Sequence, residues 1–192
     1  MDEAFYEVKR EQLAELEKVA KTGQIDLFYG DESGFSEEGY VPYGWQFRDE
    51  RVSIAAQRGQ SVNCFALISR QCKCHFALRE TNIDAQFIEE YLDAFSLQIQ
   101  KPTVVVLDNA RVHTAHKIKE RLEIWQQRGL YIFFLPPYSP QLNIAEILWK
   151  HAKGYWLRPQ DYQDWELFKL RLWFCMASVG TDLFIKFAEF KI

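Results

Sequence analysis

Three acidic residues stand where metal-dependent chemistry would need them. The stretch "VVVLDNARVH", residues 104–113, runs from four apolar residues straight into Asp108. Asp31 follows the alternating stretch "QIDLFYG", and Glu146 comes shortly after "PPYSP", where a helix is expected to begin. A strand made only for packing has no need of an acid at its end, so the role of Asp108 depends on what it meets in space.

Carboxylates that converge without partners repel one another and lose hydration. Divalent cations remove both penalties, and Mg²⁺ prefers hard oxygen ligands while it bridges to substrate phosphates. Two such ions, ~3.5–4 Å apart, can activate an attacking oxygen and stabilise the leaving oxygen of a phosphodiester. If the three acids meet, phosphodiester chemistry is the reaction that they favour.

The elements that must position these acids follow one another in a clear order. Leu13, Leu16 and Ala20 share one face of a helix predicted at residues 5–21. Short apolar or alternating stretches predict strands at 25–30, 51–57, 62–69, 74–80, 103–108 and 130–135. Further helices are predicted at 83–98, at 114–128, from about Asn143, and in the tail at 161–178 and 182–190.

This order predicts an α/β fold with a mixed sheet, antiparallel strands first and parallel strands later, and helices on both faces. Ligands of such sheets collect beyond the carboxyl ends of the parallel strands. Asp108 ends one strand, Asp31 closes another, and Glu146 lies near the start of the helix after the next. We therefore expect the three acids at one edge of the sheet.

Each acid also has a purely structural interpretation. Asp31 in "GDESG" is typical of a turn, and Asp108 with Asn109 can simply terminate a strand. Asn143 and Glu146 fit an N-x-x-E capping arrangement, in which the Glu146 side chain bonds back to the start of its helix. A single acid would be a weak signal, and the combination of three carries the hypothesis.

Composition favours one globular domain without a membrane span. The 192 residues are 48% hydrophobic and 16% aromatic, enough for one substantial core. No apolar run approaches the ~18 residues of a membrane helix, and the charged N-terminus lacks a signal-peptide core. The four cysteines are few and unevenly spaced, so we interpret them, including the "CKCH" cluster, as reduced structural thiols. A cytoplasmic protein is expected.

The charge is unevenly distributed. The net charge is −4, yet residues 1–50 hold 5 basic and 13 acidic side chains, which leaves 18 basic and 14 acidic side chains for the remainder. The later part of the chain can therefore face phosphate although the whole is acidic. This balance permits DNA as a partner.

Three blocks resemble the signatures of DDE-type transposases of the mariner-like superfamily, in particular its bacterial insertion-sequence branch. The blocks are "YGDESGF", "VVVLDNARVHTA" and "FFLPPYSPQLNIAEILWK", within residues 24–157, and 37 residues separate Asp108 from Glu146. The resemblance implies a ribonuclease-H-like fold in which Asp31, Asp108 and Glu146 are catalytic and bind two Mg²⁺ or Mn²⁺ ions. It also implies a homodimer that cleaves transposon ends and joins them to target DNA, on the nucleoid of a prokaryotic cell.

The chain departs from the family pattern in two places. Ile144 stands where relatives usually carry Pro, which removes a helix-initiating residue but no ligand. Full-length relatives also carry helix-turn-helix modules before the catalytic domain. We therefore interpret residues 1–23 as a helix or linker to a missing DNA-recognition module, and 24–192 as the catalytic domain with a helical tail. A truncated or repurposed copy that binds DNA or a partner without catalysis is the alternative, and another nuclease on the same fold is a third.

Further residues near these blocks are weaker candidates. Arg111 and Lys150 are the candidate phosphate contacts, although Lys150 also fits an exposed i,i+4 pair with Glu146. His113 can orient a group of the site or make a structural hydrogen bond at the helix entry. Trp45, after a proline-glycine turn, can stack on a base or pack in the core.

Overall fold

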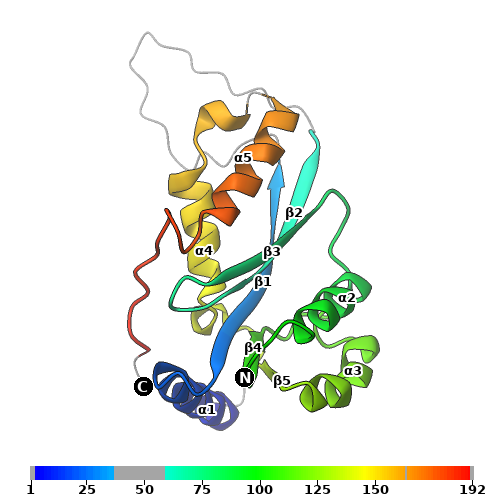
Figure 1. Ribbon diagram of the computed structural model, residues 1–192, viewed down its shortest axis with the longest axis vertical. Helices are drawn as coiled ribbons and strands as arrows, with labels where there is room; N and C mark the ends of the chain where they lie inside the picture. Colours follow the sequence, from blue (N-terminus) through cyan, green and yellow to red (C-terminus); the bar gives the residue numbers. More distant parts are fainter. Residues whose placement is uncertain (1–2, 37–58, 163, 191–192) are drawn as a thin grey trace.

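The computed structural model describes residues 3–36, 59–162 and 164–190 (Figure 1). Its centre is a five-stranded sheet in the order β3-β2-β1-β4-β5. The strands are β1 (Asp26–Ser36), β2 (Ser61–Ile68), β3 (Cys74–Arg79), β4 (Thr103–Leu107) and β5 (Leu130–Phe134). The predicted strand at 51–57 and Trp45 lie outside the described residues.

The sheet is mixed, as the element order predicts. β1 pairs with β2, and β2 with β3, in antiparallel fashion, whereas β4 pairs in parallel with both β1 and β5. β4 is fully buried along its length, which explains why "TVVVL" carries no polar alternation. The prediction of antiparallel strands first and parallel strands later is confirmed.

β1 extends well beyond its parallel neighbour. Its pairing with β4 runs from Asp26 to Tyr29, while its antiparallel pairing with β2 continues to Ser36. The last residues of β1 therefore have a neighbour on one side only. Beyond the end of β4 this leaves an open place at the sheet, and the polar residues of β1 and of the segment after β4 meet there.

Helices cover both faces of the sheet (Figure 1). Buried residues of α2 (Ala85–Ser96) and α3 (His116–Gln127) form one core with Phe28 and Val105. Buried residues of α1 (Glu3–Lys21), α4 (Ala145–His151) and α5 (Trp165–Ala177) form the other core with Tyr29 and Val106. Successive strand residues thus serve opposite layers, and each layer contributes side chains to the site described below.

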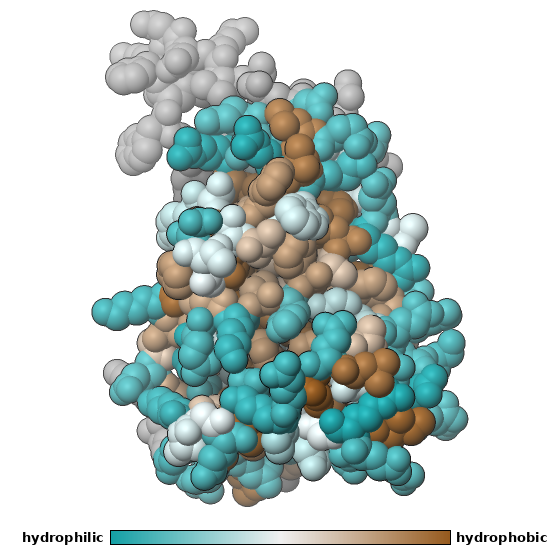
Figure 2. Space-filling view, in the orientation of Figure 1, coloured by the Kyte–Doolittle hydropathy of each residue, from teal (hydrophilic) through white to brown (hydrophobic). Residues whose placement is uncertain are grey.

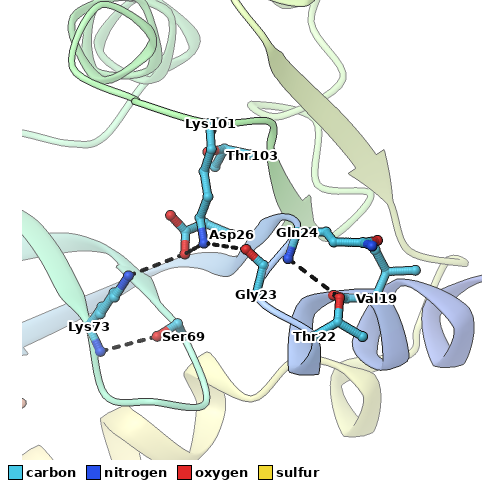
Figure 3. Close-up of polar contacts among 9 residues, drawn as sticks. All are labelled: Val19, Thr22, Gly23, Gln24, Asp26, Ser69, Lys73, Lys101 and Thr103. Carbon is cyan, nitrogen blue, oxygen red and sulfur yellow. Dashed lines mark hydrogen bonds and ion pairs between the residues drawn. The ribbon is translucent and has the colours of Figure 1, made fainter.

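Ion pairs fix the amino-terminal end of the parallel strands, far along β1 from the acids. Asp26 forms ion pairs with Lys73 and Lys101, each at 3.2 Å, and Lys101 also donates to the carbonyl of Gly23 at 3.0 Å (Figure 3). These contacts join α1, β1 and the segment before β4. The register of the two parallel strands is that of their backbone pairing, from Asp26 with Thr103 to Tyr29 with Val106, and it places the end of β4 beside β1.

The carboxyl-terminal segment departs from the predicted helix at 182–190. α5 ends at Ala177, Gly180 takes a φ of 88°, and residues 184–190 form no helix. Hydrogen bonds to residues elsewhere in the chain hold the segment. The backbone N–H of Ile185 donates to Sγ of Cys72, and Arg70 donates to the carbonyl of Ala188. These contacts compete successfully with local helical propensity, so this prediction was wrong.

α5 is apolar on more than its inner face. Its Trp165, Phe168 and Leu172 are buried, whereas other apolar side chains on the same helix remain exposed, namely Leu167, Leu170, Trp173 and Phe174. Figure 2 shows brown side chains among paler ones over the upper half of the molecule, where α5 lies. Among the described residues, no helix is both long and apolar enough to cross a membrane.

Gly30 supplies a test of how tightly the sheet is packed next to the site. A Cβ at this position would lie 2.6 Å from Leu107 Cδ2 and 3.0 Å from Leu67 Cδ2, and both leucines are fully buried. We expect Gly30→Ala to lower the free energy of unfolding by roughly 1–3 kcal/mol, because the added methyl overpacks the core. Urea denaturation measures the loss.

Gly154→Ala is the matched control for this substitution. Nothing lies within 4 Å of a Cβ at Gly154, so the methyl meets open space. This variant should be as stable as the parent chain or slightly more stable, because alanine loses less backbone entropy on folding. Equal stability of the Gly30 and Gly154 variants would contradict the packing described here.

Candidate active site

Asp31 lies within β1 rather than at its end. It pairs with Ala66 of β2, two residues after the last parallel pair, Tyr29 with Val106. The sequence-based expectation that Asp31 closes a strand was therefore wrong: β2 extends β1 beyond the apolar stretch that local alternation can reveal. The interpretation of Asp31 as a turn residue fails for the same reason.

The Asp31 carboxylate faces the α4 layer. Its Oδ2 accepts a hydrogen bond of 2.9 Å from Nε1 of Trp149. Asn143 adds a second link between α4 and β1, since its Nδ2 donates to the carbonyl of Gly30 at 3.1 Å. α4 and the segment just before it are therefore attached to β1 at two points, the carbonyl of Gly30 and the side chain of Asp31.

Asp108 follows the last residue of β4, as predicted. Its Oδ1 accepts from the backbone N–H of Ala110 at 3.0 Å and lies 2.6 Å from Nδ1 of His113. Because both contacts use the same oxygen, Oδ2 carries no hydrogen bond among those found in the described part of the chain. The loop after β4 thus presents one oxygen of Asp108 outward.

Glu146 stands exposed in the first turn of α4. The capping interpretation predicted that the Glu146 side chain bonds to the start of the helix, but Asn143 makes the side-chain bond there. The side-chain oxygen of Asn143 accepts from the backbone N–H of Ala145 at 3.1 Å. The Glu146 carboxylate is thereby left to the solvent and to the cavity beside it.

The three acids line one cavity. It has a volume of about 510 Å³, and its walls come from β1, the loop after β4, and the β5–α4 connection. Arg111 and Tyr138 also line it, whereas Lys150 is exposed and is not among the lining residues. The structure therefore brings Asp31, Asp108, Glu146 and Arg111 together and leaves Lys150 apart.

The pKa of Asp31 is raised from 3.8 to about 7. Burial is the largest cause, and the neighbouring Glu32 adds to it; the hydrogen bond from Trp149 opposes the shift, and the charges of Glu146 and Asp108 raise it further. The carboxyl is thus held in a place where a negative charge is costly. A bound cation would relieve that cost.

His113 is a buried cationic link between two carboxylates. Its Nδ1 faces Asp108 at 2.6 Å, and its Nε2 lies 3.1 Å from Glu32, an ion-pair distance without hydrogen-bond alignment. Burial by itself would lower the pKa of His113, but these two acids outweigh it and raise that pKa to about 9. The hydrogen bond from His113 in turn lowers the pKa of Asp108. His113 therefore orients a candidate site residue, one of the two roles open from sequence.

Sequence reasoning missed two further residues near the acids. Trp149 is buried and donates to Asp31. Lys153 has its Nζ 5.1 Å from the Phe35 ring centre, and although burial lowers its pKa, the charges of Glu146 and Asp31 act against that change. Lys153 lies four residues after Trp149, and this helical spacing was the available signal.

The carboxylate oxygens of the site are suitable ligands for a hard divalent cation, although the side chains do not form a complete coordination shell. Among the described residues, no group of three or more His, Cys, Asp or Glu side chains lies close enough to hold one ion. The three carboxylates nevertheless share one cavity, and Asp31 is destabilised as an anion there. Asp31, Asp108 and Glu146 are the residues that would hold Mg²⁺ or Mn²⁺.

Solved structures similar to this chain include transposase and integrase chains. A Mos1 mariner paired-end complex with Mn matches 93% of this chain and 56% of its own, with a TM-score of 0.64 and 19% identity. The Mos1 strand transfer complex gives 0.63 and 16%, covering 93% of this chain and 55% of its own. The catalytic core domain of BIV integrase gives 0.51 and 12%, covering 82% and 84%. The fold is ribonuclease-H-like, as predicted.

The family is defined by sequence. Residues 26–169 match the model of the DDE superfamily endonucleases, and all three acids lie inside that segment. The chain belongs to this family, so the resemblance to DDE-type transposases is confirmed, while the bacterial insertion-sequence branch stays a prediction. An uncharacterized protein, y4pE/y4sA, from Sinorhizobium fredii (strain NBRC 101917 / NGR234) is 27% identical over 85 residues, 43% of this chain and 58% of that protein. The chain thus spans little more than half of these Mos1 chains and of the curated relative.

Asp31→Asn is expected to stabilise the metal-free protein at pH 8. The folded-state pKa of Asp31, about 7, lies above its ordinary value of 3.8. The folded protein therefore binds a proton that the unfolded chain releases across this window, and stability falls as pH rises through it. Asparagine removes that loss, so urea unfolding in EDTA should show a gain of roughly 1–4 kcal/mol at pH 8 that shrinks toward pH 4.

Asp108→Asn is the opposite-sign control. The pKa of Asp108 is lowered, mainly by the hydrogen bond with His113, so its anion stabilises the fold above its ordinary pKa. This variant should lose stability at pH 8 under the same conditions. Destabilisation by both substitutions, or stabilisation by both, would refute the electrostatic difference assigned to the two acids.

Proposed function

We propose that this chain is the catalytic domain of a DDE transposase that cuts DNA at transposon ends and joins the ends to target DNA, with two Mg²⁺ or Mn²⁺ ions as cofactors. One observation carries the proposal: acids from β1, from the loop after β4 and from the first turn of α4 line a single cavity. Membership of the DDE superfamily endonucleases supports the DNA-cleaving chemistry.

The acids have different parts in this proposal. Asp31 and Asp108 lie on or next to the rigid sheet, fixed by Trp149 and His113 respectively, and they form the stable side of the site. Glu146 is exposed on the first turn of a helix and is freer to adjust. Divalent ions held by these carboxylates would activate an attacking oxygen and stabilise the leaving oxygen of a phosphodiester.

Basic residues supply the complement for a phosphate. Arg111 lines the cavity, and Lys153 lies near enough for the charges of Asp31 and Glu146 to affect its pKa. A phosphodiester in the cavity would meet these cations next to the carboxylates, which favours an orientation with the scissile phosphate toward the acids. Lys150, exposed and away from the cavity lining, is better suited to flanking backbone phosphates.

The remaining parts of the proposal concern the whole protein. A paired-end complex and a strand transfer complex are described for Mos1. By analogy we propose DNA ends and target DNA as partners, a homodimer as the working form, and the prokaryotic cytoplasm, on nucleoid DNA, as its place of action. The division into residues 1–23 and 24–192, with a separate recognition module, belongs to the same proposal.

Plasmid nicking tests the function. The full chain with Mg²⁺ or Mn²⁺ should relax supercoiled DNA, and Asp108→Asn and Glu146→Gln should lower the rate by at least about 100-fold, because each removes a ligand of the ions. Glu123→Gln, on the exposed face of α3, removes the same charge outside the cavity and should nick like the parent chain. Equal nicking by parent and Asp108→Asn proteins would defeat the proposal and leave a non-catalytic, DNA-binding copy.

A further inference from the structure

Tyr138 is an exposed aromatic residue in a disfavoured backbone conformation. Its exposed fraction is 92%, the highest among the exposed large hydrophobic side chains of the described residues. Its φ is 55°, in the left-handed region, which Cys72 is the one other non-glycine residue in the described ranges to adopt. A bulky side chain seldom takes this conformation, and such outliers gather at functional sites.

The conformation is imposed by rigid neighbours. Pro136 and Pro137 precede Tyr138, and the buried Ser139 donates from Oγ to the carbonyl of Pro137 at 3.2 Å. Pro140 then opens a 3₁₀ turn, Pro140–Leu142, whose Leu142 N–H donates to the carbonyl of Ser139 at 3.1 Å. The connection is anchored on both sides of Tyr138, so its ring is held in solvent by the fold.

The exposed Tyr138 side chain lies at the cavity that holds the acids. Tyr138 lines the same cavity as Asp31, Asp108 and Glu146, and Arg111 lines it too. A nucleic-acid strand that places a phosphodiester at the acids must place the adjoining bases near the walls of that cavity. An aromatic face is the surface that an unpaired base stacks on, and the flanking cation would contact the backbone.

We propose that Tyr138 is a base-stacking residue of the DNA site, and that it receives an unpaired base next to the phosphodiester on which the three acids act. The inference rests on the proposed function and adds a substrate preference to it. Every base has an aromatic face, so stacking on Tyr138 selects unpaired or frayed DNA ends over continuous duplex, without reading sequence.

Fluorescence anisotropy of the full chain with labelled DNA, in EDTA, tests this role. The probes are a single-stranded oligothymidine of 20 nucleotides and a blunt duplex of the same length. Loss of one stacked base corresponds to about 5- to 150-fold weaker binding. Tyr138→Gly should show this loss on the single strand and a smaller change on the duplex, while Tyr138→Phe keeps the ring and binds like the parent chain.

Thermal unfolding of the same variants separates binding from folding. Glycine adopts a positive φ freely, so Tyr138→Gly should melt at the parent temperature or higher while its affinity for the single strand falls. If Tyr138 had only a structural role, Tyr138→Gly would lower both the melting temperature and the affinity for the single strand. Tyr155→Ala is the control: this tyrosine is also exposed but lies outside the acidic cavity, and its loss should leave DNA binding unchanged.

Three outcomes overturn the inference. Parent-like binding of the single strand by Tyr138→Gly shows that the ring contacts no base. Equal losses in Tyr138→Gly and Tyr138→Phe assign the contact to the hydroxyl instead. In both cases a nicking defect in Asp108→Asn would still support the proposed function, so the two failures can be told apart. If the parent chain binds neither probe, the proposed function and this inference fail together.

Discussion

The site depends on one electrostatic constraint: three carboxylates share a small cavity at the place where β1 outlasts β4. Like charges at such a place repel, and burial makes each of them costlier. Hydrogen bonds from neighbouring residues hold two of these acids, and the helix that carries the third, in place. Trp149 donates to Asp31, His113 lies against Asp108, and Asn143 fastens the start of α4 to β1. The fold thereby keeps together groups that would otherwise move apart.

The two layers of helices hold the acids in different electrostatic states. Asp31 points to the α4 layer, where burial raises its pKa, and the next residue, Glu32, points to the opposite face, where it meets His113. His113 lowers the pKa of Asp108 from that second side. The anion is thus disfavoured at Asp31 and favoured at Asp108. In the function proposed above, a bound cation would offset the cost of the charge at Asp31, and the stability lost there would serve the site.

Much of the fold follows from local sequence patterns. "TVVVL" predicts the buried parallel strand β4, and the apolar spacing of 83–98 and 114–128 predicts α2 and α3, because strand and helix periodicities are local. "YIFFL" predicts the parallel strand β5 but overstates its burial, since β5 is an edge strand that leaves Tyr131 exposed. The length of β1 is not local. It is set by pairing with β2, so Asp31 was predicted at a strand end instead of inside the strand. The helix predicted at 182–190 failed similarly, since contacts with Cys72 and Arg70 decide that segment.

Some residues of the site are likewise recognisable from local sequence, and others are not. Asp108 and Glu146 are recognisable because acids at the end of an apolar strand and at a helix start are unusual in a packing motif. Trp149 is not, since a buried Trp has the same sequence signal whether it packs or supports an acid, and for His113 the sequence left two roles open. Lys150, and not Lys153, was predicted from sequence as a phosphate contact, yet Lys153 follows Trp149 by four residues and the charges of Glu146 and Asp31 act on it.

Anomalous X-ray diffraction from crystals grown with Mn²⁺ tests the shared-cation account most directly. The account predicts manganese peaks inside the cavity, each within ligand distance of at least two of the carboxylates of Asp31, Asp108 and Glu146. Manganese found at other surfaces while this cavity holds none at saturating concentration would contradict it.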